Sequence, residues 1–143
     1  MATPAPSIAA VSRRPDHMEV FWVDPADRSI RHAYWYDQGD RRWKLEPQSK
    51  ITGPQVAAPQ TSIAALARKP GTMEVFWIGQ DGSVQHAFWY EGAGPWQQGD
   101  QARIAPAGVA APQAGIAAVS RRPDHMEVFW VDPADRSIRH AYW

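Results

Sequence analysis

Short apolar segments alternate with turn-forming segments along the whole chain. The segments IAAVS, MEVFWV and SIRHAYWY follow one another between Ile8 and Tyr36, separated by Pro15 and by the turn sequence DPADR. β-Branched and aromatic residues favour strands, and segments of this length are too short for most helices. We therefore expect three strands here, followed after a glycine-containing loop by a fourth strand between Trp43 and Ile51.

The same order of segments recurs twice. The 28-residue string from Ile8 to Trp35 returns unchanged from Ile116 to Trp143, and a diverged copy runs from Ile63 to Trp89. The copies begin 55 and then 53 residues apart, and the length differences lie in turns and loops. The second copy predicts its own fourth strand between Trp96 and Ile104. Four antiparallel strands repeated at this period are typical of β-propeller blades.

The distribution of residue sizes also favours a propeller. Small residues such as Ala9 and Ala10 suit an innermost strand, which is crowded around the central channel. The next two segments are bulky at almost every position, as expected for strands covered on both faces by neighbouring blades. We therefore predict an all-β fold of two four-stranded β-propeller blades and a three-strand third blade. The expected parts are a lead-in (1-7), blade 1 (8-60), blade 2 (61-113) and a partial blade 3 (114-143).

Three blades cannot close a ring, because closed propellers have about 4 to 8 blades. An open arc would expose the aromatic faces of its two terminal blades, and large apolar patches are rare on soluble monomers. We therefore expect a homo-oligomer, with a dimer of six blades preferred and a trimer of nine blades possible. The alternative is a chain that stays open.

Charge and composition remove several classes of partner. The chain has 15 Lys and Arg against 15 Asp and Glu, which argues against nucleic acid as a partner. It has no cysteine, and no apolar run reaches the roughly 18 residues of a membrane span. The first residues lack the pattern of a signal peptide. We expect a soluble protein without membrane insertion, and the compartment stays open.

The sequence carries none of the familiar catalytic motifs, such as GxSxG, HExxH or a Walker loop. His32, His86 and His140 occupy one position per blade, so they are not expected to meet as a metal site. Glu19 has no evident second acid of the kind that a glycosidase needs. We therefore expect a protein that is not an enzyme and that uses no cofactor or metal.

The 8 Trp residues favour a binding function, because sugar rings stack their apolar faces on indole and fix their hydroxyls with polar side chains. Each repeat offers both kinds of group, with Arg13 beside the aromatics of the first copy. The alternatives are structural: aromatic core residues, a blade-to-blade anchor for the glutamate, and a buried histidine bonded to backbone. The candidate carbohydrate-binding residues are Glu19, His32, Trp35, Tyr36, Arg68, Glu74, His86, Trp89, Tyr90, Glu127, His140 and Trp143.

Several stretches together resemble the repeat of bacterial, seven-bladed, fucose-binding-type propeller lectins. They are Ser12 to Pro15, Met18 to Val23, Trp35, Gln80 to Val84 and Ile51 to Pro54. The resemblance implies a multivalent, non-enzymatic lectin that binds fucose-like or O-methylated sugars in pockets between blades. The chain lacks the strand-two Arg and strand-three Glu of the fungal fucose lectins, and Glu19 and His32 stand near those places. In a related group, short chains assemble into one ring.

A second function class remains open at this point. Exact duplication also suits a structural or engineered repeat module that assembles and has no ligand of its own. A panel of glycans would separate the two hypotheses, and the molar mass in solution would show how many blades associate.

Overall fold

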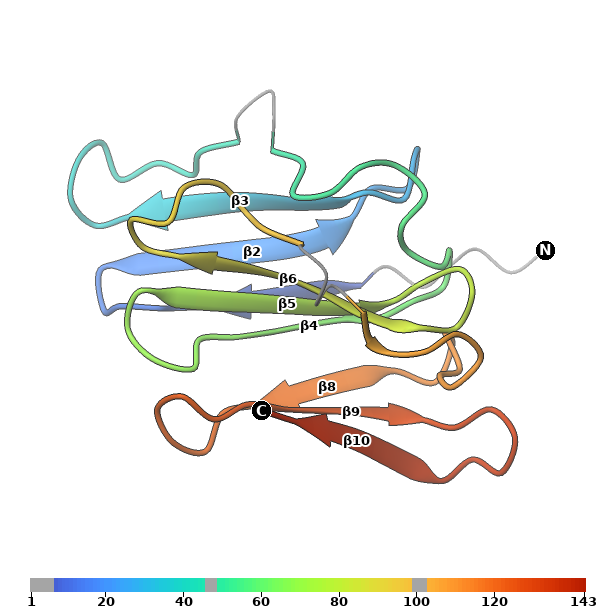
Figure 1. Ribbon diagram of the computed structural model, residues 1–143. Helices are drawn as coiled ribbons and strands as arrows, with labels where there is room; N and C mark the ends of the chain where they lie inside the picture. Colours follow the sequence, from blue (N-terminus) through green and yellow to red (C-terminus); the bar gives the residue numbers. More distant parts are fainter. Residues whose placement is uncertain (1–6, 46–48, 99–102) are drawn as a thin grey trace.

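A computed structural model describes residues 7–45, 49–98 and 103–143. The described residues form three antiparallel sheets (Figure 1), which confirms the predicted all-β fold of propeller blades. None of them forms a helix long and apolar enough to cross a membrane. The first sheet contains β1 (Ile8–Val11), β2 (His17–Val23) and β3 (Ile30–Tyr36). The second contains β4 (Ile63–Leu66), β5 (Thr72–Ile78), β6 (Val84–Tyr90) and β7 (Arg103–Ala105), and the third contains β8 (Ile116–Val119), β9 (Glu127–Val131) and β10 (Ile138–Tyr142).

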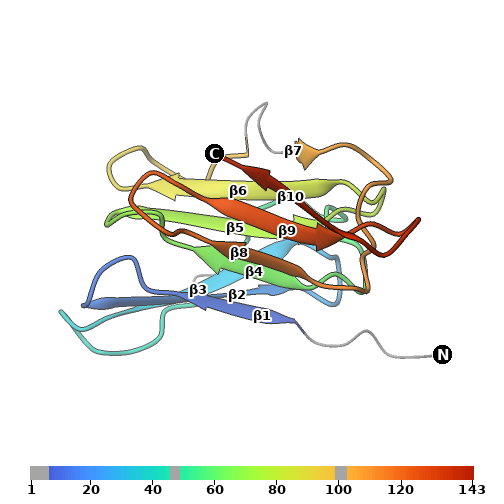
Figure 2. The ribbon, with the colours of Figure 1, turned by 90° about the horizontal axis from the view of Figure 1, so that it is seen from below.

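The three sheets stack so that their first strands, β1, β4 and β8, lie side by side (Figures 1 and 2). A serine before the first strand of one blade binds the first strand of the next. The Ser7 hydroxyl accepts the Ile63 N–H at 2.8 Å, and the Ser62 hydroxyl accepts the Ile116 N–H at 2.7 Å. The predicted innermost strands are therefore joined by a hydrogen bond that recurs with the repeat.

Strand register is the same in all three sheets. Phe21 lies opposite His32, just as Phe76 lies opposite His86 and Phe129 opposite His140. Because side chains alternate along a strand, each sheet has two distinct faces. We call them the glutamate face, which in the first sheet carries Val11, His17, Glu19, Phe21, Ile30, His32 and Tyr36, and the methionine face, which carries Ile8, Met18, Val20, Trp22, Ala33 and Trp35.

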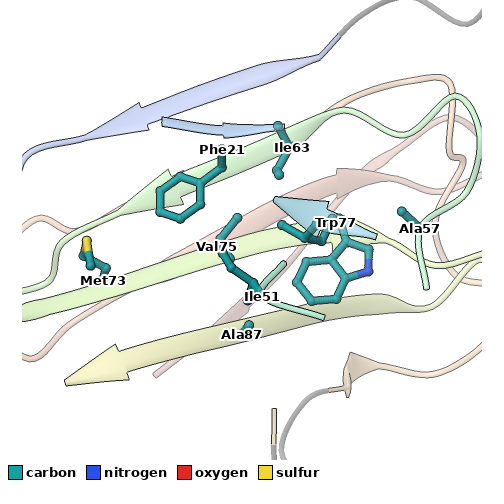
Figure 3. Close-up of a cluster of buried hydrophobic side chains, with 9 residues drawn as sticks. Phe21, Ile51, Ala57, Ile63, Met73, Val75, Trp77 and Ala87 are labelled. Carbon is teal, nitrogen blue, oxygen red and sulfur yellow. The ribbon is translucent and has the colours of Figure 1, made fainter. Parts of the chain in front are cut away.

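The glutamate face of each sheet packs against the methionine face of the next. At the first junction, Phe21 meets Met73, Val75 and Trp77 of the second sheet (Figure 3). At the second junction, Phe76, Ile78 and Val84 pack with Met126, Val128 and Trp130 of the third sheet. Strand β5 is buried at all of its seven positions, because a sheet covers it on each side. This explains the bulky, non-alternating sequences of the middle strands.

The predicted fourth strand forms in the second blade, whereas the first blade differs from the prediction. In the second blade, β7 pairs with β6, and a bridge between Phe88 and Gln97 extends the contact. In the first blade, the described residues show only isolated bridges of Lys44 with Tyr34 and Lys50 with Arg31, and the region between them is partly outside the described residues. The outer segment from 41 to 45 is exposed, so packing does not reinforce this edge. The blade limits predicted from the sequence remain a proposal.

Candidate functional site

The first junction between sheets holds a buried arginine. Arg13 lies in the loop after β1 and is only 5% exposed. Its guanidinium donates a 2.7 Å hydrogen bond to the Tyr36 hydroxyl and lies 3.3 Å from a carboxylate oxygen of Glu91. The guanidinium carbon stands 4.7 Å from the ring centre of Trp89. Because Trp89 and Glu91 belong to the second blade, the arginine is fixed by two blades at once.

The second junction repeats this arrangement with Arg68. Its guanidinium donates to the Tyr90 hydroxyl at 2.9 Å, lies over the Tyr90 ring at 5.1 Å, and donates to Glu74 at 3.2 Å. A 2.8 Å contact with Asp124 joins it to the third blade. The acids of the two junctions come from different loops, since Glu91 follows β6 and Asp124 precedes β9. The arginine and tyrosine therefore recur with the repeat, whereas the acid does not.

A buried carboxylate lies near each arginine. Glu19, 3% exposed, accepts hydrogen bonds from His17 at 3.0 Å and from His32 at 2.5 Å. Burial raises the pKa of Glu19, but the hydrogen bonds from the two histidines outweigh burial and hold the pKa below its ordinary value. Both carboxylate oxygens are therefore engaged, and the group is ionised at neutral pH.

The second blade builds the same cluster from different residues. Thr72 replaces the first histidine, and Arg68 takes over its bond to the acid. Glu74 is completely buried and also contacts His86 at 3.1 Å. The pKa of Tyr90 is raised, first by burial and then by the negative charge of Glu74, although Arg68 opposes that rise. The buried carboxylate therefore keeps two side-chain partners despite the substitution.

The predicted site residues divide between the two faces of each sheet. Trp35 and Tyr36 are neighbours in β3, so they point to opposite faces, and Trp89 and Tyr90 of β6 do the same. The first junction brings together Glu19, His32 and Tyr36 of one blade with Trp89 of the next. The second holds the cluster of Arg68, Glu74, His86 and Tyr90, whereas Trp143 is 62% exposed and lines the apolar hollow of that junction. Trp35, Glu127 and His140 lie on the two faces that no sheet of this chain covers.

Four residues of these junctions were absent from the predicted set: Arg13, His17, Glu91 and Asp124. Arg13 was noted beside the aromatics of the first copy but was not among the candidate carbohydrate-binding residues, although its equivalent Arg68 was. At the position of His17 the second copy has Thr72, so the histidine is not retained between the copies. Glu91 follows the tyrosine of the second copy, just as Asp37 follows the tyrosine of the first. That recurring acid is the signal that could have indicated Glu91. Asp124 carries no such signal, because the diverged copy has Gly71 at the equivalent position. Both positions have a left-handed backbone, at φ 60° and 81°, which glycine adopts without strain.

The two junctions differ in how tightly they are filled. At the first, Trp96 packs edge-on against Phe21 and His32, at ring-centre distances of 5.4 and 5.9 Å. At the second, a cavity of about 60 Å³ remains, with an almost entirely apolar lining. Its lining consists of Phe76, Ile104, Met126, Val128, Ala141, Tyr142 and Trp143.

The groups present suit noncovalent recognition. Among the described residues, no group of three or more His, Asp or Glu side chains is arranged to hold a metal ion. The carboxylates Glu19 and Glu74 are bound by histidine or arginine. The first junction offers a positioned guanidinium, a tyrosine hydroxyl and an indole face at the edge of an apolar interior. The second offers a guanidinium and a tyrosine hydroxyl, and a separate apolar hollow that Trp143 lines. Such a combination of apolar walls and few fixed polar groups is typical of small-ligand sites.

The chain is similar to known proteins in structure, but no match was found in sequence. No protein-family model and no curated protein sequence matches the chain. The BP39L lectin from Burkholderia pseudomallei is similar with a TM-score of 0.79 at 26% identity, over 96% of this chain and 37% of that one. The SapL1 lectin, solved with alpha-methyl fucoside, gives 0.73 at 26% identity, over 96% and 43%.

A lectin from Aleuria aurantia, described as a six-bladed β-propeller, gives a TM-score of 0.67 at 20% identity, over 95% of this chain and 41% of that one. The chain therefore spans about two fifths of the lengths of these lectins. Together the similarities show that its three sheets have the fold of part of a lectin β-propeller.

Proposed function

We propose that the chain is a non-enzymatic, carbohydrate-binding protein of the lectin type, with its ligand sites at the junctions between blades. The observation that carries this proposal is the buried Arg13, held at once by Tyr36 of its own blade and Trp89 of the next. A guanidinium offers several donors in a rigid fork to sugar hydroxyls. An adjacent indole offers a face for the apolar side of the ring.

The recurrence of this arrangement supports a site in preference to a single structural contact. Arg68 and Tyr90 rebuild it at the second junction, although the acid that completes it comes from another loop. The fold similarity to SapL1, which was solved with alpha-methyl fucoside, supports a sugar as the ligand.

For the ligand we propose fucose-like or O-methylated sugars. Fucose carries a methyl group in place of a hydroxymethyl group, and O-methylation adds a methyl to a hydroxyl. The cavity at the second junction is lined by Phe76, Ile104 and Met126, which suit a methyl group, and Arg68 at the same junction suits hydroxyls. A sugar with both kinds of group uses both parts of the junction.

The alternative is a structural repeat module with no ligand. It is favoured by one observation: the guanidinium of Arg68 already has partners in Glu74, Tyr90 and Asp124, so the cluster can serve purely to join blades. The two functions predict different effects of a sugar on the bonds of the arginine. A lectin site exchanges some of these bonds for sugar hydroxyls, whereas a structural anchor binds no sugar.

Calorimetry with Trp89→Ala tests the proposal. If Trp89 is a stacking surface, the variant loses one site per chain for alpha-methyl fucoside while its melting temperature falls little. If Trp89 is only core, the order reverses, with about 3 to 5 kcal/mol of stability lost. Arg103→Ala is the control, because Arg103 pairs with Asp81 on the surface of the second blade. Absence of binding by the unmodified chain to fucose, O-methylated sugars, galactose and amino sugars would exclude the lectin function.

We further propose that the sites act together on dense glycans. A single shallow site gains a few hydrogen bonds of about 0.5 to 1.5 kcal/mol each, so free monosaccharides bind weakly. Several sites on one rigid body raise the apparent affinity by about 10²- to 10⁴-fold. Binding to surfaces of varied glycan density measures this, and an affinity independent of density would contradict it.

A further inference from the structure

Two sheet faces are left uncovered within this chain: the methionine face of the first blade and the glutamate face of the third. On the first, Ile8 and Met18 are 69% and 43% exposed. On the second, Ile138 and Val119 are 67% and 48% exposed. Several large apolar side chains exposed on one sheet face are typical of an interaction site.

Each of these two uncovered faces has a near copy elsewhere in the chain, and that copy is packed against a face of the other kind. Apart from a counterpart of Tyr36, the glutamate face of the third blade has the same residues as that of the first, which packs against the methionine face of the second blade. The methionine face of the first blade has the same residues as that of the third, which packs against the glutamate face of the second. Each uncovered face is thus a copy of a face that binds the opposite kind.

Trp43 is an exposed aromatic residue at the methionine face of the first blade. Its repeat equivalent, Trp96, is inserted between blades against Phe21 and His32. Trp43 itself is 52% exposed and stands at a hollow of about 470 Å³ that Met18 also lines. The side chain is in the position to insert into a neighbouring blade, and the described residues provide none on that side.

The third blade carries the matching surface. Phe129 and His140 are the equivalents of the two rings that receive Trp96, and they are stacked with centres 6.0 Å apart and planes 12° apart. The corresponding pair in the first blade is stacked at 6.4 Å and 14°. The receiving surface for a tryptophan is therefore already formed before any partner arrives.

Charges at the edges of the two faces are complementary as well. Arg121 on the third blade is the exposed equivalent of Arg13. Asp37 and Trp35 on the first blade are the equivalents of Glu91 and Trp89, which hold Arg13 at the first junction.

We propose that the methionine face of blade 1 binds the glutamate face of blade 3 of a second copy, with Trp43 inserted against Phe129 and His140. Two copies make this contact twice and close a ring of six blades, within the usual range of about 4 to 8. Each contact also places Arg121 of one copy over Trp35 of the other, and so adds an arginine–indole pair that neither copy holds alone, without the tyrosine hydroxyl of the internal junctions.

Two bonds of the internal junctions are not reproduced at this contact. The third blade has no counterpart of Tyr36, whose hydroxyl accepts a hydrogen bond from Arg13 at the first junction. The serine that receives a backbone N–H from the next blade is replaced by Gly115 in the third blade. The contact therefore depends on side-chain packing. It does not depend on sugar binding, so the assembly and the proposed lectin function can fail separately.

Sedimentation equilibrium of the 143-residue chain, without sugar, measures the assembly. The expected mass is twice the 16.0 kDa of the chain at micromolar concentration. A mass of one chain across this range would overturn the proposal. A mass of three chains would overturn the six-blade ring.

Charge substitutions locate the contact. Met18→Lys and Ile138→Lys each place an unpaired charge in the proposed interface, and each should raise the dissociation constant by about a hundredfold. Trp43→Ala should raise it by about tenfold. The control is Ala26→Lys, in an exposed turn away from both faces, which should leave the constant unchanged. Circular dichroism checks that each variant folds.

Mixing the two lysine variants tests the polarity of the contact. The Met18→Lys chain keeps an intact glutamate face, and the Ile138→Lys chain keeps an intact methionine face. The mixture can therefore form one good contact, whereas either variant alone forms none. Partial recovery of the dimer mass in the mixture is expected. No recovery, or a normal dimer from either variant alone, would overturn the proposed pairing of faces.

Discussion

The first and third repeats share an identical 28-residue sequence, yet the structure gives them opposite surroundings. Ile30 is completely buried, whereas its copy Ile138 is 67% exposed. Met126 is 8% exposed, whereas its copy Met18 is 43% exposed. The exposure of a side chain in this fold is therefore set by the neighbouring sheet and not by the local sequence. Each repeat has two apolar faces, and each copy has a different one covered.

The polar groups follow the same rule. Arg13 is buried between two blades, whereas its copy Arg121 is exposed. The side chain of Glu19 is 4% exposed, against 22% for Glu127. A junction site is therefore a property of two adjacent sheets, since neither repeat has a complete site by itself. Paired substitutions in the two copies test this directly, because the chemistry is the same and only the surroundings differ.

The largest expected difference concerns Ile30 and Ile138. Ile30→Ala leaves a cavity in a fully packed junction and should lower the free energy of unfolding by about 2 to 5 kcal/mol. Ile138→Ala should cost less than about 1 kcal/mol in the dissociated chain, because most of that side chain is already in water. Denaturant unfolding at low protein concentration measures both. Equal losses would show that the two surroundings are the same in solution.

Alanine substitutions of Arg13 and Arg121 should differ less in their effect on the free energy of unfolding. Arg13→Ala removes the bond to the Tyr36 hydroxyl and the contact with the Trp89 ring, which together stabilise the fold by about 1 to 3 kcal/mol. Arg121→Ala should change stability by no more than about 0.5 kcal/mol in the dissociated chain. Thermal and denaturant unfolding of the two variants check this. A larger effect at Arg121 would contradict the assignment of the arginine to the junction.

The smallest expected effect is on the pH dependence of the free energy of unfolding. The folded pKa of Glu19 lies below its ordinary value of 4.5, so its ionised form adds stability above that pH. This contribution is lost as the pH falls through the lower, folded pKa. Asp81, Asp124 and Asp135 also have lowered pKa values and contribute to the same slope.

Unfolding measured between about pH 5 and pH 2 should therefore show a shallower slope for Glu19→Gln than for the unmodified chain. An unchanged slope would show that the two histidines do not hold the carboxylate in its ionised form.

The strands and their order could be predicted because the pattern of small, bulky and turn residues is repeated. A fourth strand was also predicted for the first repeat, but the described residues there form only isolated bridges, because the exposed side chains around Lys44 are not held by packing against another sheet. The candidate site was predicted in parts. The residue types were visible, but the alternation of side chains sends Trp35 and Tyr36 to different junctions. Asp124 was not predictable, because its role depends on the loop of another repeat.

The placement of the two half-sites on opposite faces of one repeat has a consequence for how such a chain diversifies. Duplicating one repeat copies an arginine half and a tryptophan half together, so every added unit completes one more junction. Afterwards, a substitution such as one at Tyr90 alters a single junction and leaves the junction on the other face intact. The residues of the proposed sites can therefore diverge one junction at a time, while the other junctions keep theirs.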